Sequence, residues 1–333
     1  MWASLQDKWR NRRRTSAGGE HEVSVMEWRH NGVLALRANP HAEGGPQVLA
    51  ACFVPCGVDE RERGIAQLRE KGWFTGSRNI MMLGVRQRQF TVLPRPSVPD
   101  AELAEAARWQ LQDALDYPPE EAVLDVLRLG QDEPPGRQQL GVFSLRRFEL
   151  MRLIAPFAAN KVKLEAVDVA DCAQRNLAGL HAAHGRPLAM LSLREDSMVF
   201  SVSRASEVLL SRSFDASKLG SDPSEESALA ERVGLQLQRM LDALERRSPA
   251  LSPAQILVLT DPASPSGLLT QTAELTGLRV LPFDLSGLMQ SVSIDAPEDS
   301  DAPTWRGDFL HLLGAALRPV PSPPTALHSA PTA

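Results

Sequence analysis

Residues 23–36 have the sequence VSVMEWRHNGVLAL, in which two apolar runs flank the triplet His30-Asn31-Gly32. Asn-Gly between apolar and β-branched runs is the strongest short-range signal for a β-hairpin. The segment therefore predicts two antiparallel strands. A third apolar run at 48–54 continues them as a three-strand meander.

The same order of elements returns in the second half of the chain. Apolar runs at 188–193, 198–203 and 208–214 predict a second meander. A long helix is expected after it, because Asp222, Pro223 and Glu225 provide an N-cap, an early proline and a capping box. Further elements are expected at 256–259 (strand), 268–276 (helix), 279–281 (strand) and 308–317 (helix). The repeat indicates a duplicated α/β lobe.

Between the two meanders, helices and strands alternate. A helix begins near Pro99, carries apolar residues at helical spacing and ends at the step Tyr117-Pro118. Strands are expected at 79–83, 89–93, 122–129, 139–144 and 164–169, and further helices at 60–71 and 145–160. The first half thus contains a compact α+β unit.

The composition restricts the class of protein. The 333 residues are 43% hydrophobic and 23% charged, as in an average soluble domain, and the formal net charge is −5. A nucleic-acid-binding domain is usually strongly basic, so we expect no nucleic-acid partner. Three cysteines cannot all pair, and we expect reduced thiols in the cytoplasm.

The two ends of the chain differ from the region between them. Residues 1–20 form a basic amphipathic segment with two open interpretations, a peripheral contact with anionic lipids or a solvated tail. The contact would use Trp2, Trp9, Arg10, Arg12, Arg13 and Arg14. Residues 319–333 contain five prolines and no Asp, Glu, Lys or Arg, which predicts a disordered tail.

The sequence lacks the common catalytic motifs. It contains no Walker-type phosphate loop, no Gly-x-Gly-x-x-Gly after a strand and no His-Glu-x-x-His helix. No histidine has neighbours that complete a metal-ligand set, and nothing marks Cys52, Cys56 or Cys172 as an activated thiol. We therefore expect no metal site and no catalytic residues.

A longer motif lies at 93–126. Residues 93–109 have the sequence LPRPSVPDAELAEAARW and residues 115–126 have LDYPPEEAVLDV. This stretch resembles the PilM family of type IV pilus assembly proteins, above all its MshI branch from the mannose-sensitive haemagglutinin (MSHA) pilus. In that family a proline-flanked turn leads into a helix with an Arg-Trp pair and then through a Tyr/Phe-Pro step into an acidic strand. Weaker likenesses at 167–169, 175–176 and 313–318 extend the resemblance over 23–318.

The resemblance implies an actin-like α/β fold of two duplicated RNase H-like lobes, with an inserted small α+β subdomain. The implied boundaries are a first lobe at 21–185 with its insertion at about 80–145, and a second lobe at 186–318. The duplication indicated by the strand pattern agrees with this fold.

Actin-like folds hold a nucleotide through an Asp-x-Gly hairpin in each lobe, where glycine lets the backbone approach phosphates and aspartate orients magnesium. The corresponding positions are degenerate in this chain: they fall on Met26 and Trp28, on Ser192 and Arg194, and in the adenosine-side loop on Thr260, Asp261 and Pro262. We therefore expect no magnesium-dependent ATP hydrolysis and no cofactor, with Trp28 and Arg194 filling the cleft. The alternative is that Arg194 grips a phosphate, so that ATP binds without hydrolysis.

The resemblance also implies a docking role. PilM-family members hold the short cytoplasmic N-terminus of a PilN-like single-span inner-membrane protein, so we expect this partner class, other pilus assembly platform proteins, and a cytoplasmic location peripheral to the inner membrane. Arg108, Trp109 and Tyr117 are candidates for a partner groove, and Trp109 is alternatively a packing contact between subdomain and lobe. Two rival functions are an actin-like ATPase with unusual pocket residues and the cytoplasmic platform of a type II secretion system.

Overall fold

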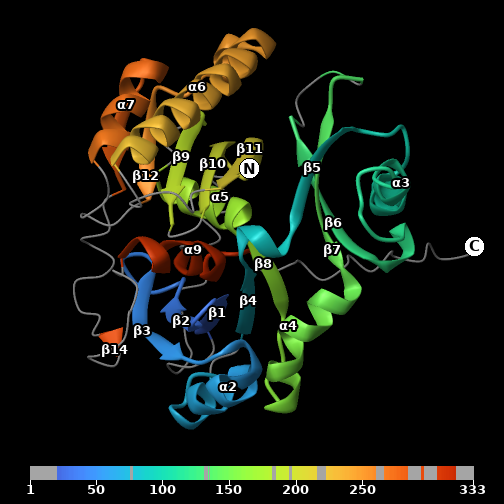
Figure 1. The fold of residues 1–333 in the computed structure, drawn as a ribbon, viewed down its shortest axis with the longest axis vertical. Coiled ribbons are helices and arrows are strands. Elements are labelled where there is room, and N and C mark those ends of the chain that lie inside the picture. Colours follow the sequence, from blue (N-terminus) through green and yellow to red (C-terminus); the bar gives the residue numbers. More distant parts are fainter. Residues whose placement is uncertain are drawn as a thin grey trace, which may run out of the picture.

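The computed structural model describes residues 21–75, 78–130, 134, 136–181, 185–194, 197–215, 223–259, 266–283, 294–295 and 306–319. Two large sheets face each other across a layer of helices, and a smaller sheet lies to one side (Figure 1). The expectations for residues 1–20 and 320–333 lie outside the described ranges.

The first lobe is built on a sheet of strand order β14-β3-β2-β1-β4-β8. The predicted hairpin is present, with Arg29 opposite Gly32, and β3 continues the meander. Gly32 has no room for a side chain, because a Cβ there would come within 2.5 Å of the Val54 carbonyl oxygen. The strands are β1 (Val23–Arg29), β2 (Gly32–Asn39), β3 (Gln47–Pro55), β4 (Arg78–Leu83), β8 (Ala166–Val169) and β14 (Ile294–Asp295), and the outer helices are α2 (Arg61–Glu70) and α4 (Arg147–Ala159).

The second lobe repeats this plan with strand order β11-β10-β9-β12-β13. Three antiparallel strands form the second predicted meander, and β12 adds to it in parallel. The expected helix stripe is buried at Val233, Leu237 and Leu244. The elements are β9 (Leu188–Leu193), β10 (Ser197–Arg204), β11 (Glu207–Asp215), β12 (Gln255–Leu259), β13 (Arg279–Pro282), α6 (Pro223–Arg247) and α7 (Ser266–Thr276).

The inserted subdomain is a three-stranded antiparallel sheet of order β5-β7-β6 covered by one helix. It comprises β5 (Gln89–Pro94), α3 (Leu103–Gln110), β6 (Ala122–Leu129) and β7 (Gln139–Arg146), so it begins after β4, which belongs to the first sheet. Leu103, Ala107 and Leu111 form its small core. The helix ends at Gln110, earlier than expected, and a turn follows in which residues 112–114 are exposed and gain nothing from burial.

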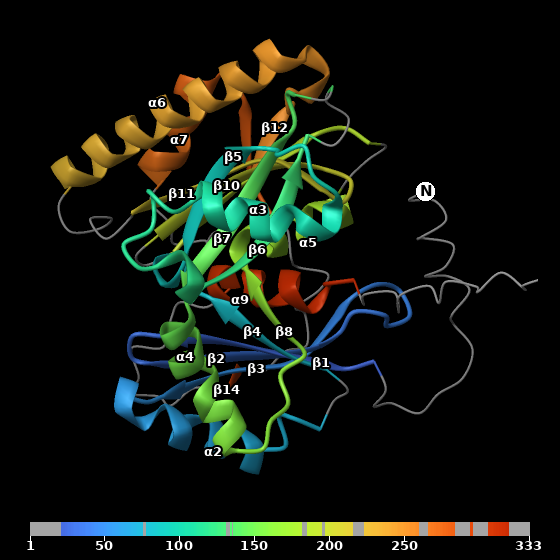
Figure 2. The ribbon, with the colours of Figure 1, turned by 90° about the vertical axis from the view of Figure 1, so that its right-hand side faces the viewer.

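Two helices fill the layer between the large sheets: α5 (Ala170–His181) and α9 (Arg306–Ala316) (Figure 2). The sequence pattern did not predict α5. Although α9 follows the second lobe in the chain, it packs on α5, β1 and β2, so it belongs structurally with the first lobe. One apolar cluster runs through this layer and includes Val25 and Leu36 of one sheet and Met190 and Leu257 of the other. The two lobes therefore share a core.

Within the described ranges, no helix is both long and apolar enough to cross a membrane.

The close approach of α9 to α5 gives a first prediction. A Cβ at Gly314 would collide with the Ala173 backbone carbonyl, so Gly314→Ala must push the two helices apart. We expect the free energy of unfolding to fall by about 1–3 kcal/mol, measured by chemical denaturation. Gly57→Ala is the matched control, since its Cβ would make only an ordinary contact, 3.6 Å from Glu60. Equal stability of the two variants would contradict the tight packing.

Candidate functional site

The β1–β2 and β9–β10 hairpins face each other between the lobes, and an ion pair joins them. Arg194, at the end of β9, donates through Nη2 to Glu27 Oε2 in β1 at 2.8 Å. Both side chains are about as buried as the core, with exposed fractions of 3% and 2%. A buried pair of this kind is held by direct Coulomb attraction with little screening by water or salt. The contact connects two residues that are 167 positions apart in the chain.

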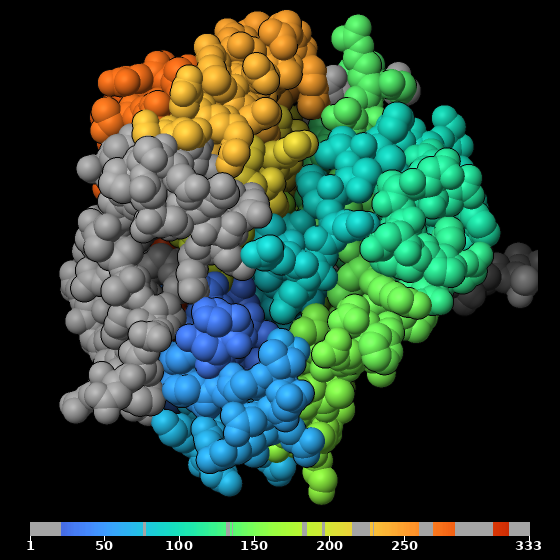
Figure 3. All heavy atoms as spheres, viewed as in Figure 1, coloured from blue at the N-terminus to red at the C-terminus, as the bar shows by residue number. Residues whose placement is uncertain are grey.

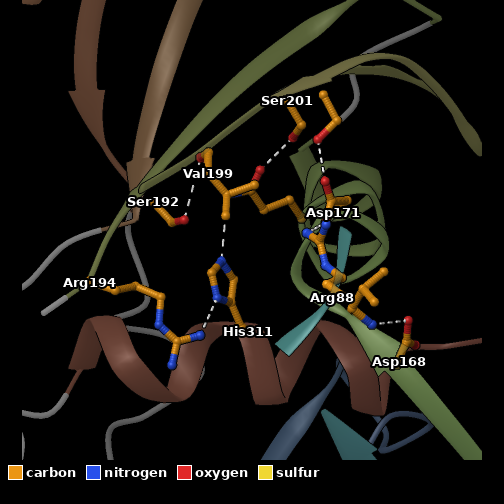
Figure 4. Close-up of polar contacts among 11 residues, drawn as sticks. Arg88, Asp168, Asp171, Ser192, Arg194, Val199, Ser201 and His311 are labelled. Atoms are coloured by element: carbon orange, nitrogen blue, oxygen red, sulfur yellow. Dashed lines mark hydrogen bonds and ion pairs between the residues drawn. The ribbon is translucent and has the colours of Figure 1, made fainter. Parts of the chain in front are cut away.

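His311 of α9 extends this contact. Its Nδ1 lies 2.9 Å from Nη1 of Arg194 (Figure 4). Because a guanidinium can only donate, Nδ1 accepts and the imidazole is neutral. Burial, followed by the positive charge of Arg194, holds the pKa of His311 well below its ordinary value.

The residues assigned to the first nucleotide hairpin lie on the other face of the sheet. The indole Nε1 of Trp28 donates to the Leu153 carbonyl at 3.0 Å, and Met26 joins the same core beneath α2 and α4. The prediction that Trp28 fills the cleft is wrong. Side chains alternate along a strand, so Glu27, between them, faces the second lobe.

The residues assigned to the second hairpin are buried. Arg194 lies between the two lobes, where it pairs with Glu27. Ser192 is buried, and its Oγ donates to the Val199 carbonyl at 3.4 Å (Figure 4). Thr260, Asp261 and Pro262 lie outside the described residues.

A second buried pair lies where the inserted subdomain begins. Arg88 donates to one carboxylate oxygen of Asp171 on α5, and Ser211 of β11 donates to the other (Figure 4). The guanidinium also lies over the Phe143 ring of β7, 4.9 Å from its centroid. This cluster ties the subdomain to α5 and to the second lobe. On the face shown in Figure 3, the teal segment leading into the subdomain lies between the two lobes.

A third buried carboxylate, Asp168 in β8, lies close to an arginine that is partly exposed. Arg318, just after α9, places Nη1 3.2 Å from Asp168 Oδ2. The other oxygen, Oδ1, accepts from the Val169 backbone amide at 2.8 Å.

These pairs decide whether the cleft fits a magnesium nucleotide. Magnesium is bound through carboxylate oxygens, waters and substrate phosphates. The buried carboxylates of Glu27, Asp168 and Asp171 each have an arginine partner instead. In the described part of the chain, no group of three or more His, Cys, Asp or Glu side chains is arranged to hold a metal ion. The described cleft residues do not fit magnesium and triphosphate.

The cysteines are also poorly suited to nucleophilic chemistry. None of the three forms a disulfide, and Cys52 is buried in the core. Burial raises the pKa of Cys172 to about 12 and raises the pKa of Cys56 as well. Thiols with raised pKa values are protonated and unreactive near neutral pH.

The three candidate groove residues have different environments. Trp109 is 52% exposed, and its indole donates to Glu105 at 3.1 Å. Arg108 is structural, because Nη1 donates to the Pro119 and Ala122 carbonyls at the start of β6. The Tyr117 hydroxyl is buried, and burial raises its pKa. Only Trp109 of the three offers a large exposed surface.

Comparison with solved structures identifies the class of fold. One match is the "PilM-PilN type IV pilus biogenesis complex", with TM-score 0.61 and 17% identity over 89% of this chain and 97% of that chain. A second is a Bacteroides thetaiotaomicron protein with an actin-like ATPase fold and unknown function, with TM-score 0.50 and 12% identity over 80% and 91%. The chain thus has the expected actin-like fold, and an internal ion pair joins its two hairpins.

Other comparisons add little. The cytoplasmic domain of EpsL, an inner-membrane component of the Vibrio cholerae type II secretion system, matches with a TM-score of only 0.48 at 12% identity, over 90% of this chain and 96% of that chain. No family model and no curated protein sequence matches the chain.

The energetic coupling between Glu27 and Arg194 can be tested by measuring the free energy of unfolding of variants. Glu27→Gln leaves Arg194 buried without its charge partner, which should lower the free energy of unfolding by about 3–5 kcal/mol. Replacing both residues, by Glu27→Leu with Arg194→Met, should recover most of that loss, because no buried charge remains. Chemical denaturation of the single and double variants measures the difference. Additive losses in the double variant would show that the pair is not coupled.

His311 predicts a pH dependence of stability. The unfolded chain protonates this ring near pH 6.5, whereas the folded chain does so only at lower pH. The free energy of unfolding should therefore fall as pH decreases below about 6.5, by at most about 1.4 kcal/mol per pH unit. His311→Gln should flatten this slope relative to the wild-type chain. An unaltered slope in His311→Gln would assign the titration to other groups.

Proposed function

We propose that this protein is a non-catalytic scaffold of a type IV pilus assembly machine of the MSHA-like type. It docks the cytoplasmic N-terminus of a PilN-like inner-membrane protein and works in the cytoplasm at the inner membrane. The observation that carries the proposal is the buried Glu27–Arg194 contact, which joins the two hairpins between which an actin-like fold would bind its nucleotide.

The ion pair explains how the two hairpins are held without a nucleotide. In actin-like proteins both hairpins contact the phosphates and their metal. Here an anion from one lobe meets a cation from the other at 2.8 Å, and His311 orients the cation. ATP and magnesium would have to break this contact and leave both charges buried. That cost weighs against the ATPase alternative and against phosphate binding by Arg194.

Two further observations support the docking role. The fold is similar to that of the PilM–PilN complex over nearly the whole length of both chains. The sequence motif at 93–126, which resembles the PilM family, forms most of the inserted subdomain, where Trp109 presents a large exposed ring. An exposed indole beside polar groups is typical of a binding hot spot.

The docking role predicts what the protein captures. The tagged full chain, incubated with the native membrane fraction, should recover a small single-span pilus protein equally well with and without magnesium-ATP. Trp109→Ala should reduce recovery several-fold, and Leu180→Ala, an exposed apolar residue outside the subdomain, should not. Quantitative mass spectrometry of the bound fraction measures both. Capture that requires ATP, or recovery of no membrane protein, would refute the scaffold.

Nucleotide binding is tested separately. Calorimetric titration of the purified chain with magnesium-ATP should give no saturable heat, and phosphate release should stay at background. Saturable binding by the wild-type chain that Arg194→Met abolishes would favour the phosphate-gripping alternative, and hydrolysis would favour the ATPase.

A further inference from the structure

A pocket of about 630 Å³ opens at the base of the first lobe, away from the cleft. It lies where β4 and β8 begin, whereas Asp168 and the segment leading to Arg88 lie toward the other end of these strands. The end of α2 and the segment between α4 and β8 form its walls. The lining residues are Arg69, Phe74, Thr75, Asn79, Lys161, Val162, Lys163 and Glu165.

The pocket is locally basic in a chain of net charge −5. Its one acid, Glu165, is held by Arg78 through two hydrogen bonds of 2.7 Å and is therefore neutralised. Within the described ranges, the hydrogen bond that Arg69 makes is to the Asn160 carbonyl, at 2.9 Å. Lys161 and Lys163 are exposed, and no acidic side chain among the described residues pairs with either. Three cationic groups thus face the opening with no acid to balance them.

Lys161 occupies a position that usually takes glycine. Its φ is +57°, directly after the end of α4. The Lys161 and Val162 amides, each at 2.9 Å from a carbonyl of the last helical turn, close the helix in the usual left-handed way. A lysine at this position carries a conformational cost that glycine would avoid.

The pocket also has room for an organic group beside the charge. Phe74 and Val162 supply apolar surface within the lining. A phosphate with an attached glycerol body matches this combination of cations and apolar wall better than a bare anion does.

The chain enters the described structure beside this pocket. Val23 pairs with Arg78, and Ser24 Oγ donates to the Trp73 carbonyl at 2.5 Å, next to Phe74. The preceding sequence carries the basic residues Lys8, Arg10, Arg12, Arg13 and Arg14. The basic pocket and the basic sequence that precedes β1 both favour an anionic membrane surface.

We propose that the pocket formed around Arg69, Lys161 and Lys163 binds the phosphate of an anionic phospholipid headgroup, so that the base of the first lobe faces the membrane. This site is distinct from the docking role proposed above and does not depend on it. The cations neutralise the phosphate, and Phe74 and Val162 contact the glycerol part.

The test is co-sedimentation of the full chain with vesicles. We expect binding to phosphatidylcholine vesicles that contain phosphatidylglycerol, and little binding to phosphatidylcholine alone. Lys161→Gly with Lys163→Gln should weaken binding roughly twenty-five-fold, because each basic residue near the surface contributes a factor of about five. Glycine accepts the φ of residue 161 without strain, so the variant should fold normally.

The matched control removes the same charge elsewhere. Arg232→Ser with Arg239→Ser lies on the exposed side of α6, in the second lobe, and should bind like the wild type. The residues before 21 are unchanged in every variant, so the comparison isolates the pocket. Equal weakening in both double variants, or no preference of the wild type for phosphatidylglycerol, would overturn the proposal. A thermal shift with inorganic phosphate that only the pocket variant loses, with vesicle binding unchanged, would reassign the site to free phosphate.

Discussion

The arrangement of this molecule depends on one apolar cluster that both lobes share. Val25 and Leu36 from the first sheet and Met190 and Leu257 from the second pack around α9 within a single core. Two lobes with separate cores could open about a hinge. Here, opening would expose the α5–α9 layer to water at about 25 cal/mol per Å² of apolar surface, so the spacing of the two hairpins is fixed by packing before any polar contact is considered.

Within this layer the polar groups form matched pairs. A carboxylate that is buried without a partner would be strongly destabilising, and Glu27, Asp168 and Asp171 each meet an arginine from a distant part of the chain. Such pairs add little net stability, because desolvation offsets their attraction, but they define one relative position of the elements that they join. A nucleotide pocket needs the opposite condition, in which carboxylates and backbone amides remain available to a ligand.

Local signals explain what the sequence could predict. Asn31-Gly32 and the cap at Asp222 predicted the first hairpin and α6, and the repeated meander predicted the two lobes. The pattern missed α5 because two of its inward positions, Asp171 and Gln174, are polar and interrupt the apolar stripe. The pattern also missed β14, because a strand of only two residues gives no alternation that a sequence can reveal. Glu27 was not among the predicted site residues either. Its role depends on a partner 167 positions away, which no local pattern encodes.

The two ends of the described chain lie close together at the base of the first lobe. Arg78 pairs in register with Val23, and its guanidinium donates to the Arg318 carbonyl at 3.2 Å. A pulling force applied between these ends would therefore act on the pairing of β1 with β4 and on the end of α9. Because α9 lies in the layer that both lobes share, such a load would be transmitted into the common core and not to a free edge of the sheet.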